Sequence, residues 1–289
     1  MSNKFVQLLR PHHYVKNVFI FAPLFFGLKF DNIGLLVKSA YAFAAFCAVA
    51  SAAYAFNDIF DAEEDRLHPD KMRRPVASGA ITVPTAAAIS GAALLCAMLL
   101  ATAAGDGVWR FILFYATLNI AYTLRLKHVP ILDVSVIAVG FVLRLFTGAS
   151  ATGVPLSIWI IITTFLLSLF LALAKRRHDC VLYQKSGMMT RKVLDGYNLD
   201  FLNIAMGIMA MIVVMAYLTY TVSPEVAGRI HSDYLYLTTF FVLVGIMRYL
   251  QLAFVEENGG NPTNALLRDR FLQCVVSGWI IVFAWILYR

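Results

Sequence analysis

The stretch that decides the fold is Ser39-Ala-Tyr-Ala-Phe-Ala-Ala-Phe-Cys-Ala-Val-Ala-Ser-Ala-Ala-Tyr-Ala-Phe-Asn57, which has no charged side chain and runs directly into Asp58-Ile-Phe-Asp-Ala-Glu-Glu-Asp65. A helix needs about 18 to 20 apolar residues to cross the hydrocarbon of a bilayer. Further uncharged runs of comparable or greater length occupy residues 75–105, 145–174, 201–224 and 271–288. We therefore predict an all-α integral membrane protein.

The composition agrees with a bilayer environment. Of the 289 residues, 60% are hydrophobic and 14% are charged, and the mean hydropathy is +0.73. These values exclude an ordinary soluble fold. The hydropathy pattern predicts about nine transmembrane helices in a single domain covering residues 1–289, with boundaries good to a few residues. The predicted spans are residues 14–30, 34–57, 83–104, 108–125, 131–150, 156–174, 199–222, 233–254 and 270–287.

Basic residues gather in every second connection between these spans. Most of the 24 Lys and Arg residues fall near residues 4–16, 66–74, 125–127, 175–192 and 248–270. Because basic loops stay on the cytoplasmic side, we predict a cytoplasmic N-terminus and a multi-pass protein of the inner membrane. The net charge of +7 is then explained by topology and anionic lipids, and no nucleic-acid-binding motif accompanies it.

The acidic run that follows the first quoted stretch is the strongest candidate site. At about 100° per residue, a continuing helix would place Asn57, Asp58, Asp61 and Asp65 on one face. Carboxylates a few ångströms apart repel by roughly 4 kcal/mol per pair at an effective dielectric of 20. A hard divalent cation would remove that repulsion, and Mg²⁺ usually completes its shell with water and substrate phosphate. We therefore predict a Mg²⁺–diphosphate site on the cytoplasmic side.

A basic loop follows the acids at once. It contains Arg66, Lys71, Arg73 and Arg74, and then the helix-breaking Pro75 and the Ser78-Gly79 turn. Such cations can bind the phosphate oxygens that a metal leaves free. The alternative is that the acidic run is a solvated helix end balanced by these basic residues.

Together these residues resemble a known family. Asn57-Asp58-x-x-Asp61-x-x-x-Asp65 followed by Arg74-Pro75-x-x-Ser78-Gly79 resembles the first aspartate motif and loop of the UbiA-type transferase superfamily. Tyr122-Thr-Leu-Arg-Leu-Lys127 is similar to the YxxxLK segment of that superfamily. The resemblance implies a nine-helix bundle in which Mg²⁺ binds a diphosphate substrate.

Four further stretches resemble the decaprenyl-phosphate phosphoribosyltransferase branch of this superfamily. They are Arg10-Pro-x-x-x-Val-Lys16-Asn17, Lys127-His-Val-Pro-Ile-Leu-Asp133, Gly140-Phe-Val-Leu-Arg144 and Lys175-Arg176-Arg177. The second DxxxD motif of prenyltransferases is missing after the sixth span, where Asp195 and Asp200 stand five residues apart. This departure favours the phosphoribosyltransferase branch and weakens the prediction of a second metal site.

The remaining basic residues suit a site that holds three phosphate groups. Lys16, Lys127, Lys175, Arg176 and Arg177 would contribute, although anchoring by the positive-inside rule explains about half of them. Arg144 lies about 16 Å inside its span and needs a partner, either an acid in the bundle or a lipid phosphate.

The resulting hypothesis is a Mg²⁺-dependent transfer of phosphoribose from a diphosphate donor to a polyprenyl phosphate, for cell-envelope biosynthesis. It assigns catalysis to Asp58, Asp61 and Lys71. It assigns metal binding to Asn57, Asp58, Asp61 and Asp65. Whether the protein forms a homo-oligomer is left open. The predicted substrate-binding residues are Lys16, Arg66, Lys71, Arg73, Arg74, Tyr122, Lys127, Arg144, Lys175, Arg176, Arg177 and Asp195.

Two other functions stay open. The first is prenyl transfer from a prenyl diphosphate to an aromatic acceptor, which would use the same metal face. The second is transport through a cation-binding vestibule, although a transporter favours acids or broken helices at mid-bilayer.

Overall fold

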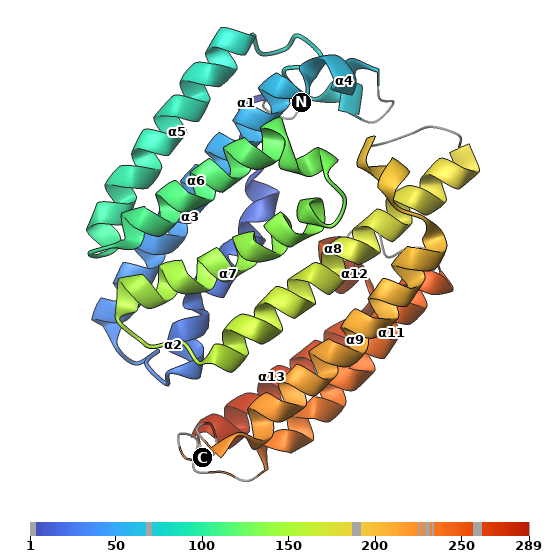
Figure 1. Cartoon of the computed structure of the whole chain (residues 1–289). Helices are drawn as coiled ribbons and strands as arrows, with labels where there is room; N and C mark the ends of the chain where they lie inside the picture. Colours follow the sequence, from blue (N-terminus) through green and yellow to red (C-terminus); the bar gives the residue numbers. More distant parts are fainter. Residues whose placement is uncertain are drawn as a thin grey trace. The chain divides into compact units, whose positions relative to one another are not determined.

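The computed structural model describes residues 4–67, 71–186, 192–224, 226, 228, 232, 234–256 and 262–288. These residues form helices joined by short connections (Figure 1). The chain divides into two compact units: unit 1 is Met1–His128 with Val139–Leu156, and unit 2 is Val129–Ala138 with Ser157–Arg289. The prediction of one domain stays a prediction.

Unit 1 is built on three apolar helices, α3, α5 and α6, which lie side by side in Figure 1. Alanines at fully buried positions, among them Ala42, Ala45, Ala97 and Ala101, allow the helix backbones to approach closely. The elements of unit 1 are α1 (Lys4–Leu9), η1 (Pro11–Phe21), α2 (Ala22–Phe26), α3 (Ile33–Phe60), α4 (Ala62–Arg66), η2 (Lys71–Arg73), α5 (Val83–Ala104), α6 (Val108–Leu124), η3 (Leu126–His128) and most of α7 (Leu132–Thr152).

Unit 2 contains the first turns of α7 and the remaining long helices. Its core packs Phe170, Leu202, Met206 and Tyr249 from three of these helices. The other elements of unit 2 are α8 (Ile158–Ser186), η4 (Lys192–Gly196), α9 (Leu199–Val222), η5 (Leu235–Thr238), α11 (Thr239–Phe254), α12 (Pro262–Arg268) and α13 (Arg270–Tyr288).

Polar side chains define where several of the long helices begin. Asn32 accepts a hydrogen bond from the Leu35 amide at the start of α3, and Asn198 accepts one from the Phe201 amide at the start of α9. Thr82 caps α5 in the same way. Each cap satisfies a backbone donor that the helix leaves unpaired.

The segment predicted as a span at residues 14–30 is not one continuous α-helix, and whether it crosses the membrane stays a prediction. The segment forms the 3₁₀ helix η1 and then the short helix α2, because Pro11 and Pro23 remove backbone donors. Arg10 also adopts a left-handed backbone, with φ of 52°, which separates α1 from η1.

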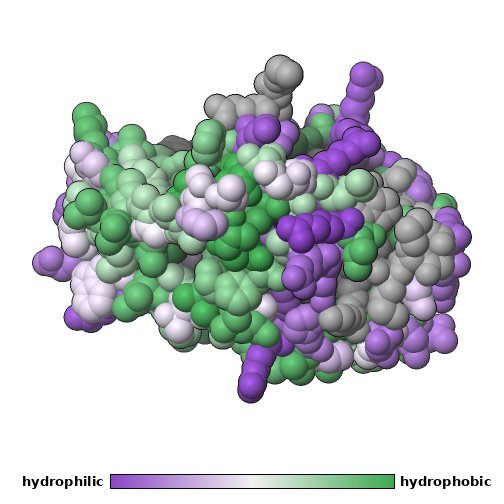
Figure 2. All heavy atoms as spheres, turned by 90° about the horizontal axis from the view of Figure 1, so that it is seen from above, coloured by the Kyte–Doolittle hydropathy of each residue, from purple (hydrophilic) through white to green (hydrophobic). Residues whose placement is uncertain are grey.

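Among the described residues, seven helices are long and apolar enough to cross a membrane, and α6 is an eighth apolar helix of 17 residues. The all-helical membrane architecture is confirmed, whereas the count of nine spans and the orientation of the N-terminus stay predictions. Large apolar side chains such as Leu99, Met211 and Ile281 are exposed on these helices. Figure 2 likewise shows broad hydrophobic areas on the face it presents, as expected for side chains that meet lipid.

In unit 2, helix α8 continues well beyond the predicted end at residue 174. It reaches Ser186, so Lys175, Arg176 and Arg177 lie within the helix. The charged residues do not end it, because Arg176 and Arg177 find buried polar partners.

A strained loop joins the two units and precedes α7. Ile131 has a φ of 71°, which is unfavourable for a β-branched residue. Its amide donates a hydrogen bond of 2.6 Å to the Tyr197 hydroxyl, and that hydroxyl donates one of 2.7 Å to Asp133. A Cβ at Gly196 would collide with Pro130, so Gly196 is needed for this loop to pack against η4.

Gly148 of α7 is required by a close approach within unit 1. A Cβ at this position would collide with the carbonyl group of Ile20 in η1. We expect Gly148→Ala to lower stability by about 1–3 kcal/mol, the usual cost of overpacking, measured as thermal unfolding in detergent. Gly91→Ala in α5 is the control, because a methyl group added there would meet nothing within 4 Å. An unchanged melting temperature for Gly148→Ala would contradict the close approach.

Tyr197 supplies the second stability test. Tyr197→Phe removes the partner of both the Ile131 amide and the buried Asp133 carboxylate, so we expect it to cost about 1–3 kcal/mol. Tyr234→Phe is a matched control, since Tyr234 is 64% exposed. Thermal unfolding of the two variants in the same detergent makes the comparison. Equal melting temperatures would show that the loop does not depend on this hydroxyl.

Candidate active site

The acidic run lies where α3 ends in unit 1. The prediction of one uninterrupted helix through it is wrong, because α3 ends at Phe60 and α4 starts at Ala62, with Asp61 between them. Asp58 and Asp65 are buried, at 1% and 3% exposure, and Asp61 is only partly covered. Three carboxylates thus lie at the end of an apolar helix, where their charge must be neutralised.

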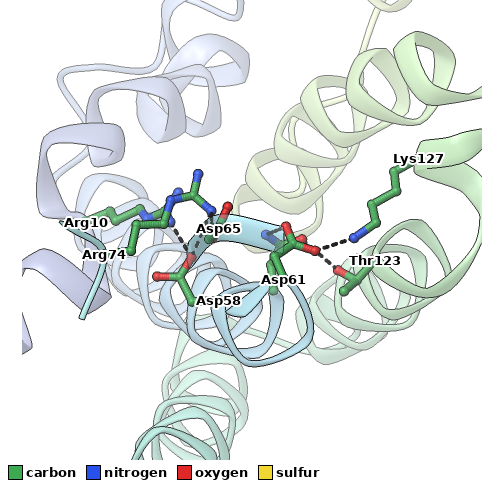
Figure 3. Close-up of polar contacts among 8 residues, drawn as sticks. Arg10, Asp58, Asp61, Asp65, Arg74, Thr123 and Lys127 are labelled. Atoms are coloured by element: carbon green, nitrogen blue, oxygen red, sulfur yellow. Dashed lines mark hydrogen bonds and ion pairs between the residues drawn. The ribbon is translucent and has the colours of Figure 1, made fainter. Parts of the chain in front are cut away.

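Asp58 and Asp65 form one pair, which shares Arg74. The guanidinium of Arg74 lies 2.6 Å from Asp65 and 3.4 Å from Asp58. Arg10 donates to the same oxygen of Asp58, Oδ1, at 2.5 Å. Figure 3 shows both guanidinium groups converging on these carboxylates. Burial lowers the pKa of Arg10, and Asp58 acts in the opposite direction, so Arg10 remains a cation at neutral pH.

Asn57 and Asp61 form the second pair. The Asn57 amide donates to Asp61 at 2.7 Å, and Lys127 forms an ion pair with Asp61. The Thr123 hydroxyl donates to Asn57 at 3.3 Å. In Figure 3, Asp61 points toward Lys127 and Thr123, whereas Asp58 points toward Arg10 and Arg74. The four predicted metal ligands therefore lie in two pairs and do not form one common face.

The loop that follows α4 is held so that Arg74 reaches the acids. The Ser78 amide donates to the Arg74 carbonyl at 2.9 Å, and Gly79 takes the left-handed conformation with φ of 74°. Arg66 donates to the Ala77 carbonyl at 3.2 Å and so stabilises the loop backbone. Of the predicted phosphate-binding residues here, Lys71 is partly buried and Arg73 is exposed in η2.

The donor set fits a hard cation. Asn57 and the three aspartates offer oxygen atoms only, which suits Mg²⁺. Asp58 Oδ2 is buried and has no hydrogen-bond partner among the described residues, as expected of an oxygen reserved for a ligand. Within the same residues, no three His, Cys, Asp or Glu side chains form a preassembled metal cage. A bound cation would therefore depend on water or substrate oxygens as well.

Arg144 is buried in unit 1, and among the described residues no acid forms an ion pair with it; the alternative of a lipid phosphate stays a prediction. Its Nε donates to Asn17 at 2.8 Å and its Nη1 to the Gly140 carbonyl at 2.7 Å. Its guanidinium also lies 4.6 Å from the centre of the Phe46 ring. Neutral oxygens and aromatic rings therefore stabilise this cation, so it has a structural use whether or not it binds substrate.

Arg176 and Arg177 also have structural partners, in unit 2. Arg176 is 1% exposed and donates to Asp133 at 2.5 Å and to Asp179 at 3.1 Å. Arg177 donates to Asn203 at 2.7 Å and to the Ala253 carbonyl at 2.5 Å. These two predicted substrate-binding residues therefore tie helix ends together.

The other predicted residues lie in varied settings. Lys16 and Tyr122 in unit 1 are partly buried, whereas Lys175 and Asp195 in unit 2 are exposed. The segment that stands in place of the second aspartate motif covers residues 190–200, and its first two residues, 190 and 191, lie outside the described residues. The substrate-binding roles of these four side chains stay predictions.

Four polar residues with central positions were not predicted as site residues. Arg10 and Asp133 lie within the quoted motifs, and Thr123 follows Tyr122, so attention to every polar residue of those motifs would have found them. The local sequence around Tyr197 did not indicate a role for this residue. Burial and its hydrogen bond to Asp133 raise the pKa of Tyr197, which keeps this hydroxyl protonated and able to donate.

Comparison with known proteins agrees with this architecture. The UbiA prenyltransferase family model matches residues 19–287. Decaprenyl-phosphate phosphoribosyltransferase of Corynebacterium glutamicum is 31% identical, over 100% of this chain and 88% of that protein. The protein of the same name from Mycobacterium tuberculosis is 30% identical, over 95% and 91%.

Solved structures share the fold. A UbiA homolog from Archaeoglobus fulgidus bound to GPP and Mg²⁺ superposes with a TM-score of 0.75 at 19% identity, covering 99% of this chain and 100% of that one. The apo UbiA homolog of Aeropyrum pernix has a TM-score of 0.69 at 14% identity, covering 95% and 98%. The chain therefore belongs to the UbiA prenyltransferase family and is an integral membrane transferase.

Proposed function

We propose that the chain transfers 5-phosphoribose from phosphoribosyl pyrophosphate to a polyprenyl phosphate and releases pyrophosphate, with Mg²⁺ at the acidic cluster of unit 1. The main support is the full-length similarity to two decaprenyl-phosphate phosphoribosyltransferases, at 30% and 31% identity. The geometry of unit 1 agrees, because three cations meet three carboxylates at one end of α3.

The charges of this cluster suit a pyrophosphate leaving group. When bound, Mg²⁺ would supply positive charge to the pyrophosphate oxygens. Arg10, Arg74 and Lys127 neutralise the carboxylates of the protein itself. Each can exchange a carboxylate oxygen for a phosphate oxygen, since both are anionic acceptors. These side chains would then hold the leaving group as the bond between ribose carbon 1 and its oxygen breaks.

The acceptor needs little activation. A phosphate monoester is already an anionic nucleophile at neutral pH, so an oxygen of the lipid phosphate can attack carbon 1 without a general base. The polyprenyl tail remains in the bilayer, which holds the lipid phosphate near the membrane surface and favours the correct orientation. On this proposal the active site faces the cytoplasm, where the donor is soluble.

A second candidate is prenyl transfer to an aromatic acceptor. It is favoured by one observation, the GPP and Mg²⁺ bound by the Archaeoglobus homolog of the same fold. The two candidates share the acidic cluster and differ in the acceptor and in the organic group that leaves the diphosphate.

The choice of donor separates these candidates. With Mg²⁺ in detergent, the purified protein should form a phosphoribosyl lipid from phosphoribosyl pyrophosphate and a polyprenyl phosphate, detected by mass spectrometry. Geranyl diphosphate with 4-hydroxybenzoate should give no product. Chelation of Mg²⁺ should stop turnover, and added Mg²⁺ should restore it. Turnover of the prenyl donor alone would refute the proposal.

Asp61→Asn tests the acidic cluster directly. The substitution removes the charge that pairs with Lys127, and we expect kcat to fall by about 100-fold or more, the scale on which one electrostatic group acts in a site. Asp106→Asn is the matched control, because Asp106 is an exposed acid between α5 and α6. Thermal unfolding should show both variants folded. Retained activity in folded Asp61→Asn would count against the metal assignment.

A further inference from the structure

Lys16 stands on η1 between Arg10, which precedes this helix, and Asn17, which accepts a hydrogen bond from Arg144. Burial, and then the positive charges of Arg144 and Arg10, disfavour the charged form of Lys16. Arg10 reaches Asp58 near the end of α3, while Arg144 packs on Phe46 deeper in the same helix. From Phe46 to Asp58 the helix axis rises about 18 Å. The three basic residues therefore form a row that extends from the acidic cluster into the apolar part of unit 1.

The two outer cations of this row are neutralised or solvated by protein groups. Arg10 pairs with Asp58 at 2.5 Å, and Arg144 donates to the oxygens of Asn17 and Gly140. Lys16 is different, because no carboxylate of the described residues forms an ion pair with it, although its side chain is partly buried. A buried cation at membrane depth is costly without a counter-charge. Among the described residues, Lys16 is thus the member of the row that has neither an ion pair nor a hydrogen bond.

Between Phe46 and Asp58, helix α3 carries two residues with hydroxyl groups, Ser51 and Tyr54. Ser51 hydrogen-bonds the Tyr14 hydroxyl at 2.7 Å and the Leu9 carbonyl at 2.9 Å. The Tyr54 ring lies 5.2 Å from the Arg10 guanidinium. These groups are polar and uncharged, so they do not provide the missing negative charge. An anionic ligand would provide it.

The surface around Lys16 indicates where such a ligand comes from. Its neighbours Val15 and Val18 on η1 are 52% and 53% exposed, and Phe19 is 37% exposed. Exposed apolar side chains of a membrane helix meet lipid tails. A ligand that carries both an anion and a hydrocarbon chain can therefore place its charge at Lys16 while its chain lies along η1.

We infer that Lys16 binds the phosphate monoester of the lipid acceptor. The inference rests on the proposed function and adds the position of the acceptor phosphate to it. Lys16 would act as a point charge for phosphate, on the deeper side of the acidic cluster. The 5-phosphate of the donor has the same chemistry, and the apolar surface of η1 is the reason to choose the lipid. A neutral acceptor would leave Lys16 without a counter-charge.

Steady-state kinetics test this assignment. Lys16→Met should raise the KM for polyprenyl phosphate by about 10- to 100-fold, because this is the loss of affinity expected when one charge-assisted hydrogen bond is removed. The KM for phosphoribosyl pyrophosphate should stay within about threefold of the wild-type value, and Lys16→Arg should restore most of the acceptor affinity. Lys38→Met is the matched control, since Lys38 is an exposed cation near the start of α3. A rise in the KM of the donor instead would assign Lys16 to the donor phosphate and overturn the inference.

Binding without turnover separates this inference from the proposed function. Polyprenyl phosphate and the corresponding uncharged polyprenol are added to the wild type and to Lys16→Met in detergent, without donor, and the shift in melting temperature is measured. The phosphate should stabilise the wild type more than the alcohol does, and Lys16→Met should lose that difference. If Lys16→Met does not fold, Lys16→Gln replaces it.

The outcomes are distinct. Equal phosphate-dependent stabilisation of the wild type and the variant would refute the Lys16 site even if the enzyme is active. A wild type that binds polyprenyl phosphate through Lys16 but does not turn over phosphoribosyl pyrophosphate would refute the proposed function and support the site.

Discussion

Two of the three aspartates at the end of α3 are almost fully buried, and a buried carboxylate is stable only when its charge is neutralised. In unit 1, Arg10 and Arg74 neutralise these two carboxylates, and Lys127 pairs with Asp61. Arg10 and Lys127 stand 48 and 66 residues from their partners, whereas Arg74 is nine residues from Asp65. The left-handed Arg10 and the turn after Arg74 place cations at Asp58 and Asp65, and η3, which follows α6, places Lys127 at Asp61. The conformations of the three connections that carry Arg10, Arg74 and Lys127 thus depend on the need to neutralise the acidic run.

The same arrangement connects stability with chemistry. A set of carboxylates balanced by cations can accept a metal and a diphosphate together, because the added positive and negative charges compensate each other. The unsatisfied Asp58 Oδ2 shows that the balance is incomplete in the protein alone. Removing one partner of such a cluster therefore affects both folding and ligand binding, so activity has to be compared among variants shown to be folded.

Basic residues of similar appearance in the sequence have different uses in the structure. Arg144 and Arg176 are both deeply buried, yet one is stabilised by neutral oxygens and rings and the other by two carboxylates. Lys127 joins the acidic cluster, and Lys16 lies among cations. Hydropathy and charge counts cannot separate these cases, because each depends on which distant side chain lies opposite.

The sequence by itself determined the membrane-helical class, most helix positions and the acidic run as the candidate site. These features depend on local properties: run length against bilayer thickness, proline positions, and the type of side chain that holds a hard cation. Tertiary structure alone decided that Asp58 and Asp65 pair through Arg74 while Asp61 turns to Lys127, and that Tyr197 holds a left-handed Ile131. The physical reason is that an ion pair or hydrogen bond between residues far apart in the chain forms only after packing has brought its two partners within about 3 Å.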